Sequence, residues 1–100
     1  MNTTIVRKIN SQGRLQLSKD LCDYAGIGKE TRVVIKKGVK NNEIYIIAVD
    51  KVQDSEEVIA FLKVDSKCRV VIPTEIKKND DTFEITATRE KIIIRTKSGY

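Results

Sequence analysis

The feature that most constrains this chain is an internal repeat with a spacing of 55 residues. The segment "INSQGRLQL", residues 9–17, aligns without gaps with "VDSKCRVVI", residues 64–72, so that Arg14 matches Arg69. Positions expected to face a core are apolar in both segments. Each repeat is too short to cover a hydrophobic core by itself. We therefore expect two interlocked halves that share one core.

Two later segments match in the same order, at spacings of 50 and 48 residues. The matched pairs are Val33 with Phe83, Ile35 with Ile85, Ile44 with Ile92, and Ile46 with Ile94. Four matches in one order favour duplication over chance. We interpret the chain as a single domain, residues 1–100, in which repeats 5–49 and 61–96 are joined by a connector, residues 50–60.

Each repeat predicts the order strand, turn, strand, short helix, strand, turn, strand. The strands are expected at 5–9, 14–17, 31–37 and 44–49 in the first repeat, and at 61–64, 69–72, 82–88 and 91–96 in the second. Ser18 is a good N-cap for the first helix and Gly26 a good stop, while Pro73 suits the first turn of the second helix. The fourth strand of each repeat is apolar on both faces, which indicates a central position.

The turn and the connector differ from the strands in composition. Cys68 replaces Gly13 in the second copy of the turn, which predicts a different backbone geometry there. In the connector, Ser55 followed by two glutamates predicts the start of a short helix. The connector is acidic, and we expect it to lie away from the basic surface.

Charge is unevenly distributed along a chain whose formal net charge is +5. Residues 1–20 carry four cations and one acid, whereas residues 41–60 carry five acids and one cation. Segregation of this kind favours one positive face and an anionic partner. Lys36, Lys37 and Lys40 form a separate basic cluster that we interpret as ordinary surface.

Several classes of function are disfavoured by what the sequence lacks. There is no histidine, "GIGK" lacks the spacing of a phosphate-binding loop, and "NDD" reads as a turn. We expect neither an enzyme nor a metal or cofactor site. Cys22 and Cys68 are expected to be small buried side chains without a disulfide. No signal peptide or membrane-spanning run is seen, so a cytoplasmic location is expected.

The order of elements, headed by "VRKINSQGR", resembles the AbrB-type swapped-hairpin regulators. The residues that carry the likeness are Val6, Arg7, Lys8, Gly13 and Arg14 in the first copy, and Asp65, Arg69 and "VVIP" in the second. The same D-x-x-x-R spacing marks the related MraZ family, which has two repeats in one chain. The resemblance implies a mainly β fold, a swapped-hairpin (cradle-loop type) β-barrel built from two ββαββ repeats with short helices.

The resemblance also implies a prokaryotic transcription regulator that binds duplex DNA in a sequence-dependent way through basic β-hairpins. The candidate DNA-binding residues are Arg7, Lys8, Arg14, Lys63, Lys67, Arg69, Lys77 and Lys78, with Lys19 as a further cation. Arginine suits this task because its planar fork pairs with phosphate or guanine. We expect the Asp65 carboxylate to fix the direction of Arg69.

The two copies depart from the family pattern in different ways. Cys22 and Asp23 stand where the family often has helix arginines, whereas the second copy has the two lysines at 77 and 78. Asn10 replaces the family aspartate in the first copy. These differences argue against a palindromic footprint on DNA.

Two alternatives stay open, an antitoxin of MazE type and an adaptor on the same fold that does not bind DNA strongly. Only four residues follow the second repeat, so the flexible tail with which such antitoxins wrap a toxin is missing, and a toxin partner is not expected. The chain could act alone as an internal pseudo-dimer, or as a homo-oligomer that exchanges halves.

Overall fold

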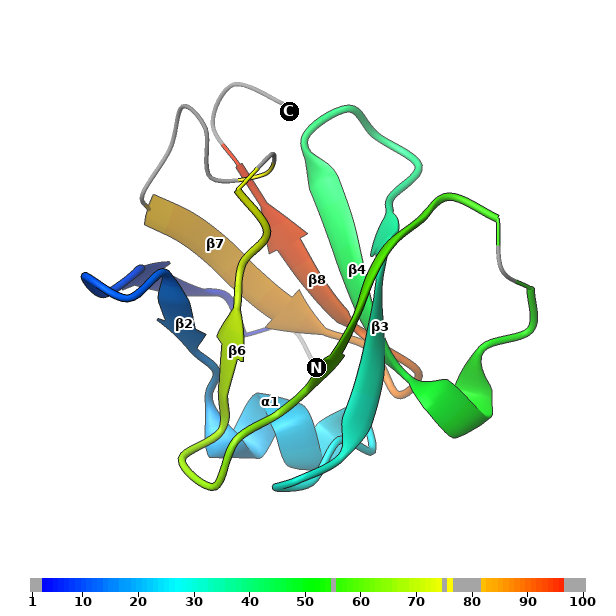
Figure 1. Ribbon diagram of the computed structural model, residues 1–100, viewed down its shortest axis with the longest axis horizontal. Helices are drawn as coiled ribbons and strands as arrows, with labels where there is room; N and C mark the ends of the chain where they lie inside the picture. Colours follow the sequence, from blue (N-terminus) through cyan, green and yellow to red (C-terminus); the bar gives the residue numbers. More distant parts are fainter. Residues whose placement is uncertain (1–2, 55, 75, 77–81, 97–100) are drawn as a thin grey trace.

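The fold is given by a computed structural model, which describes residues 3–54, 56–74, 76 and 82–96. These residues form eight strands, one α-helix and one short 3-10 helix (Figure 1). The elements are β1 (Ile5–Lys8), β2 (Arg14–Gln16), α1 (Lys19–Tyr24), β3 (Arg32–Lys37), β4 (Glu43–Ala48), η1 (Val49–Lys51), β5 (Val58–Lys63), β6 (Arg69–Val71), β7 (Thr82–Ala87) and β8 (Ile92–Arg95).

The strands form a six-stranded antiparallel sheet in the order β1-β7-β8-β4-β3-β5 and a separate two-stranded sheet of β2 and β6. The central places of β4 and β8 confirm the prediction made from their apolar sequences. The closed barrel is not formed among the described strands. The larger sheet ends at β1 and β5, and the β2–β6 pair packs beside these edges without a continuous hydrogen-bonded ladder.

The two arms of each expected hairpin pair with other strands. Strand β1 pairs with β7, β5 pairs with β3, and the second strands β2 and β6 pair with each other. The prediction of a basic hairpin with paired arms is therefore wrong in its local pairing. The physical reason is that each arm finds its hydrogen-bond partner in the other half of the chain, which interleaves the two halves.

The pairing registers are related by exchange of the two halves. At the repeat spacing of 55 residues, Arg14 is equivalent to Arg69, and Val71 is equivalent to Gln16. The structure pairs Arg14 with Val71, and it also pairs their two equivalents, Arg69 and Gln16. Leu15 faces Val70, its own equivalent, across the β2–β6 pair. The same holds for Tyr45 and Ile93 across β4 and β8. An approximate twofold relation therefore passes through both contacts, and this supports the interpretation as a repeat.

Helix α1 begins and ends where its sequence predicts. The Ser18 side chain accepts a hydrogen bond from the Leu21 backbone nitrogen, and Ala25 and Gly26 close the helix, with Gly26 at a φ of 75°. The Lys51 ammonium donates to the Ala25 carbonyl at 3.2 Å, which satisfies one of the free carbonyls of the last turn. The second helix, expected after Pro73, falls mostly outside the described residues.

The connector is shorter than predicted. Residues 58–60 belong to β5, and Glu56 and Glu57 form a turn where a helix was expected. The short helix of the connector is η1, immediately after β4. The sequence "VIAF" does not alternate in polarity, because β5 is a half-buried edge strand, and the usual strand signal is weak there.

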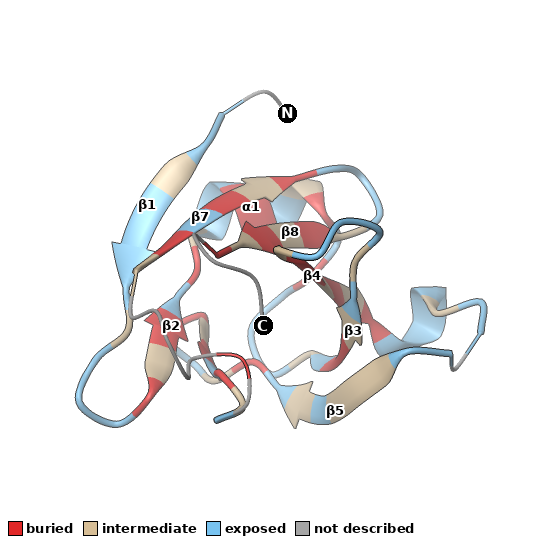
Figure 2. Cartoon of the chain, turned by 90° about the horizontal axis from the view of Figure 1, so that it is seen from above, coloured by how far each residue is buried: buried red, intermediate tan, exposed pale blue. Residues whose placement is uncertain are grey.

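Both halves contribute to one buried core (Figure 2). The largest buried side chains are Leu15, Leu17, Leu21, Ile27, Ile35, Ile44, Ile46, Ile72, Ile76, Phe83, Ile85 and Ile92. Cys22 and Cys68 are buried and free, as predicted. Burial raises the pKa of the Cys22 thiol to about 12, with smaller contributions from Cys68 and Asp23. At neutral pH Cys22 is therefore a protonated, unreactive core side chain.

Candidate nucleic-acid interface

The two turns that precede β2 and β6 have the same hydrogen bonds. In the first turn the Asn10 Oδ1 atom accepts from the backbone nitrogens of Gln12 and Arg14, both at 2.9 Å. In the second, Asp65 Oδ1 accepts from the residues at 67 and 69, again at 2.9 Å. An asparagine and an aspartate are interchangeable here because each offers the same acceptor oxygen.

The backbone of the two turns is also the same, which corrects the prediction made from Cys68. Gly13 has a φ of 76°, and Cys68, its equivalent, has a φ of 61°. The nitrogen of Leu17 donates to the Cys68 carbonyl at 2.9 Å, and the nitrogen of Ile72 donates to the Gly13 carbonyl at 3.0 Å. These long-range hydrogen bonds and the burial of the thiol hold Cys68 in a conformation that glycine would adopt more easily.

The β2–β6 pair has one buried face and one outer face. Leu15 and Val70 are directed into the core. Residues alternate between faces along a strand, so the neighbours on either side of these two share the outer face. The outer face therefore consists of Arg14, Gln16, Arg69 and Val71. We call this surface the arginine ribbon.

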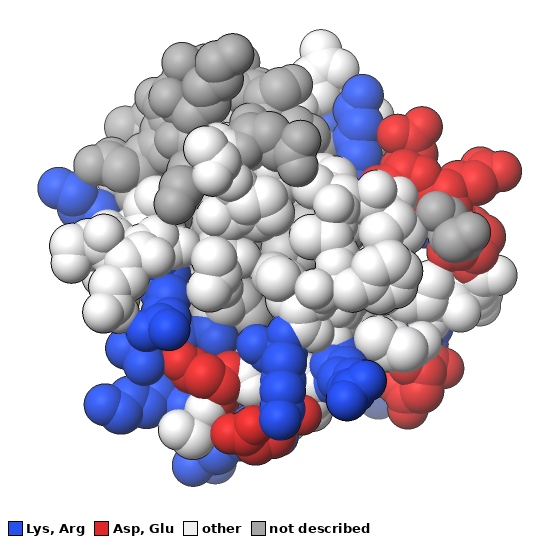
Figure 3. All heavy atoms as spheres, viewed as in Figure 1, with Lys and Arg blue, Asp and Glu red and all other residues white. Residues whose placement is uncertain are grey.

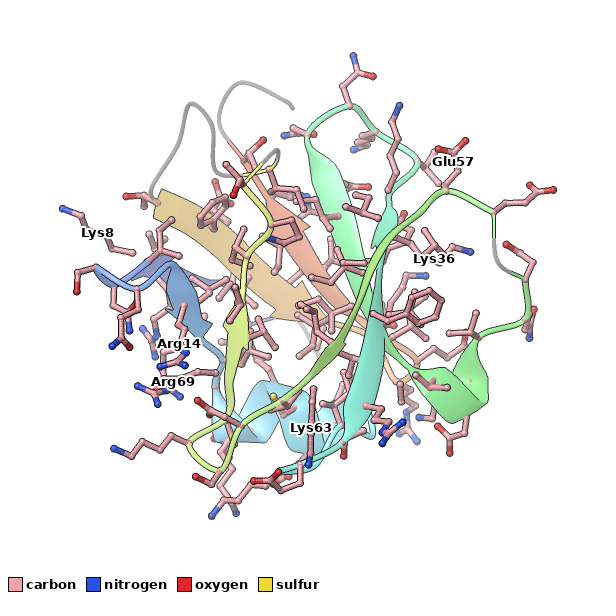
Figure 4. The ribbon with its side chains drawn as sticks, viewed as in Figure 1. Lys8, Arg14, Lys36, Glu57, Lys63 and Arg69 are labelled. Carbon is pink, nitrogen blue, oxygen red and sulfur yellow. The ribbon has the colours of Figure 1, made fainter. Side chains whose placement is uncertain are left out.

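Arg14 and Arg69 lie side by side on this ribbon (Figure 4). Arg14 pairs with Val71, which is two residues after Arg69 on β6. Arg14 and Arg69 are therefore diagonal neighbours across the antiparallel pair. Diagonal neighbours have backbones about 7–8 Å apart. The sequence predicted both arginines as site residues, and the pairing of β2 with β6 is what brings them together.

Local contacts orient both guanidinium groups. Arg69 Nε donates to Asp65 Oδ2 at 2.8 Å in a partly buried ion pair, and Arg14 Nη1 donates to Gln12 Oε1 at 2.7 Å. Partial burial acts to raise the pKa of Asp65, but hydrogen bonds from the Arg69 and Lys67 backbone and from the Arg69 side chain lower it overall. Asp65 is therefore ionised at neutral pH. Within the described residues, no partner is found for the terminal nitrogens of Arg69, which stay available for an anion.

The remaining candidate cations are spread over neighbouring elements. Lys67 lies in the turn before β6, and its carbonyl accepts from Gln16 Nε2 at 2.7 Å, so it borders the ribbon directly. Arg7 and Lys8 are exposed at the end of β1 that leads into the first turn, and Figure 4 shows Lys8 on the same side of the molecule as the two arginines. Lys77 and Lys78 lie outside the described residues.

Lys19 and Lys63 are paired with carboxylates. Lys19 contacts Asp23 at 3.7 Å on the exposed surface of α1. Lys63 contacts Glu30 at 3.0 Å and lies on β5, away from the arginine ribbon in Figure 4. Exposed ion pairs of this kind contribute little stability and exchange readily with other anions. Lys19 follows β2 closely in the sequence, whereas Lys63 belongs to a different part of the surface.

The acidic connector lies away from the basic surface, as expected. Figure 3 shows one group of acidic side chains at the upper right, while the cations at the lower left and along the lower edge are interspersed with other acidic side chains. Lys36, which we interpreted as ordinary surface, is paired with Asp54 of the connector at 2.8 Å. The ion pair with Lys36 and a hydrogen bond from the Glu56 backbone nitrogen lower the pKa of Asp54. The Lys36 charge is therefore neutralised locally.

Two residues that lie next to candidate cations are not predicted from the sequence. Gln16 lies on the outer face of the ribbon. It could have been predicted from the sequence, because it is two residues after Arg14 and residues two apart on a strand share a face. Arg32 faces Lys63 directly across β3 and β5, which only the strand pairing reveals.

Other kinds of site are not evident in the described part of the chain. No group of three or more potential metal ligands comes together there. No helix in those residues has the length and apolar character needed to cross a bilayer.

Comparison with known proteins does not assign the chain to a family. No protein-family model matches it, and a search of curated proteins found no significant relative.

Proposed function

We propose that this protein is a DNA-binding transcription regulator of the AbrB type, with a swapped-hairpin arrangement supplied by two repeats in one chain. The observation that carries the proposal is the arginine ribbon, in which Arg14 and Arg69 lie together on the outer face of a two-stranded antiparallel pair. The interleaved pairing of the two halves agrees with the swapped hairpins of that family.

The ribbon has the right form for the major groove of B-DNA. That groove is about 12 Å wide and accepts a two-stranded β-ribbon. The guanidinium groups of Arg14 and Arg69 would lead into the groove and bind guanine edges or flanking phosphates. Asp65 holds Arg69 through Nε, so the two terminal nitrogens of the guanidinium would be left for bidentate recognition.

Cations around the ribbon would bind the phosphate rows. Lys67 is next to the ribbon, and Arg7 and Lys8 extend the basic surface along β1. The equivalent residues in the second half are Leu62 and Lys63, on β5. The two ends of the ribbon therefore offer different numbers of cations, and the preferred DNA site should be directional and not palindromic.

An adaptor without strong DNA binding is the second candidate. The observation in its favour is that Asp65, Asp23 and Glu30 each pair with one of the candidate cations. Local carboxylates reduce the attraction for phosphate, so the adaptor predicts weak binding to every duplex.

A salt series on duplex DNA distinguishes the two. The intact chain is titrated into a fluorescent pool of duplexes with a randomised centre, and the bound fraction is sequenced. A regulator should enrich a directional motif, and its log affinity should fall with log salt at a slope of about −4 to −5, which corresponds to about five phosphate contacts. Absence of enrichment, together with a slope near zero, would favour the adaptor.

A further inference from the structure

The surface around β5 differs from its equivalent on β1 in a way that the shared fold does not require. The exchange of halves makes Phe61 equivalent to Val6, Leu62 to Arg7, and Arg32 to Thr82. Both edges have the same pairing register with their neighbouring strands. Since the fold accepts valine and threonine on one edge, stability does not explain an aromatic ring and a guanidinium on the other.

The β5 surface exposes apolar groups around an open hollow. Phe61 is 70% exposed and Val49 is 44% exposed. These two residues line a hollow of about 570 Å³, and the other described residues that line it are Arg32, Val33, Leu62 and Lys63. A hollow of this size is enough to receive one or two side chains of a partner. We call this surface the β5 groove.

The strand beside the groove has an unpaired edge. Strand β5 ends the larger sheet, with β3 as its only ladder partner among the described strands, and Figure 2 shows it at the rim of the molecule. Natural proteins usually protect such edges with prolines or several charged residues. The six residues of β5 contain no proline and one charge, Lys63, and β6 packs near this edge without forming a ladder with it, so backbone groups of β5 remain for an added strand.

The charged residues at the β5 groove indicate what kind of partner it binds. Arg32 and Lys63 are directly opposite in the register, and like charges at such positions repel. Lys63 has Glu30 as a partner at 3.0 Å, whereas the Arg32 side chain makes no ion pair or hydrogen bond with any other described residue, although its backbone belongs to the β3–β5 ladder. One positive charge is therefore left in excess beside exposed apolar groups. Figure 3 shows a largely uncharged face whose lower margin carries both cations and acidic side chains.

We propose that the β5 groove binds an acidic peptide segment of a partner protein, which adds to β5 as an extended strand. Its apolar side chain packs on Phe61 in the hollow, and a carboxylate pairs with Arg32. This surface is separate from the arginine ribbon, so the inference does not depend on DNA binding. The protein would then bind DNA and a protein partner through two different faces.

A peptide selection tests the proposal. Random nine-residue peptides displayed on phage are selected on the intact protein, and each enriched peptide is then measured by fluorescence anisotropy. The expected peptides carry net negative charge with apolar residues at alternate positions. Phe61→Ser should weaken their binding at least about tenfold, and Arg32→Gln should weaken it and reduce the preference for acidic sequences. Both side chains lie on the surface, so melting temperatures should change little.

Val6→Ser is the matched control, because it makes a similar change at the equivalent position of β1 and should leave peptide binding unchanged. Amide chemical shifts should move mainly along β5 on addition of peptide. The proposal is overturned if no peptide is enriched, if the enriched peptides are neutral or basic, or if Val6→Ser weakens them as much as Phe61→Ser. It is also overturned if Phe61→Ser weakens duplex DNA binding or dissociates a homo-oligomer, since the groove would then serve DNA or a second copy of the chain.

Discussion

Replacement of both ribbon arginines by alanine should remove sequence-specific DNA binding without unfolding the protein. Each arginine that binds a base edge or a phosphate contributes about 1–3 kcal/mol. If Arg14 and Arg69 act independently, the double variant loses about 2–6 kcal/mol, which lowers affinity between about 30-fold and more than 10⁴-fold. The slope of log affinity against log salt should become shallower by about 1.8, or about 0.9 for each phosphate that the variant no longer neutralises.

Little stability should be lost, because the described contacts of these side chains are local. Arg14 contacts Gln12 in its own turn, and Arg69 contacts Asp65 in its own. The melting temperature should therefore change by no more than about 4 °C. Fluorescence anisotropy on the selected duplex gives the affinities, and thermal unfolding followed by circular dichroism gives the stability.

A matched variant separates position from total charge. Lys37→Ala together with Lys40→Ala also removes two positive charges, but from exposed positions at the distant turn between β3 and β4. At physiological salt, charges farther away than about 8 Å are largely screened. This control should change affinity only slightly. Equal losses in the two double variants, or an unchanged affinity in the arginine variant, would show that the ribbon is not the binding surface.

Three further predictions concern the framework that holds the ribbon. Gly13→Ala places a side chain at a φ of 76° and should lower the free energy of unfolding by about 1–2 kcal/mol in urea titrations; a neutral effect would refute the need for a left-handed residue. Leu15→Ala opens a cavity where the halves meet and should cost about 2–5 kcal/mol, whereas a loss below about 1 kcal/mol would place that residue outside the core. Cys22 has a folded pKa of about 12. Its thiol is therefore protonated in both the folded and the unfolded state below about pH 7.5 and has no effect on the pH dependence of stability there. From about pH 9 to 12 only the unfolded thiol ionises, so the wild type should lose about 1.4 kcal/mol per pH unit relative to Cys22→Ala, and parallel pH curves would contradict the assigned burial.

Local sequence predicted the elements well where a single residue or a short period determines the structure. Ser18 and Gly26 bound the helix as expected, because capping depends on one side chain and on one backbone angle. The isoleucine-rich fourth strands are central, because a strand that is apolar on both faces must be covered on both. The two ribbon arginines were also selected, since the repeat places them at equivalent positions.

Errors occurred where a distant contact overrides the local signal. Cys68 takes the left-handed turn of a glycine, because its carbonyl accepts from Leu17 and its thiol is buried. The start of β5 was assigned to the connector, because an edge strand that pairs on one side need not alternate in polarity. A role for Arg32 is not predicted from the sequence, because its place beside Lys63 follows only from the β3–β5 register.

The amino-acid sequence by itself determined the order of the strands, the place of α1, the repeat, and the residues that carry charge or enter the core. These properties depend on neighbours a few positions away, where polarity and backbone preference act directly. Only the tertiary structure decided which strands pair: β1 with β7, β5 with β3, and β2 with β6. The backbone groups of a strand can form hydrogen bonds with many other strands. The pairing that occurs is the one that buries both halves in one core. That pairing brings Arg14 beside Arg69, and it leaves β5 with β3 as its only ladder partner among the described strands.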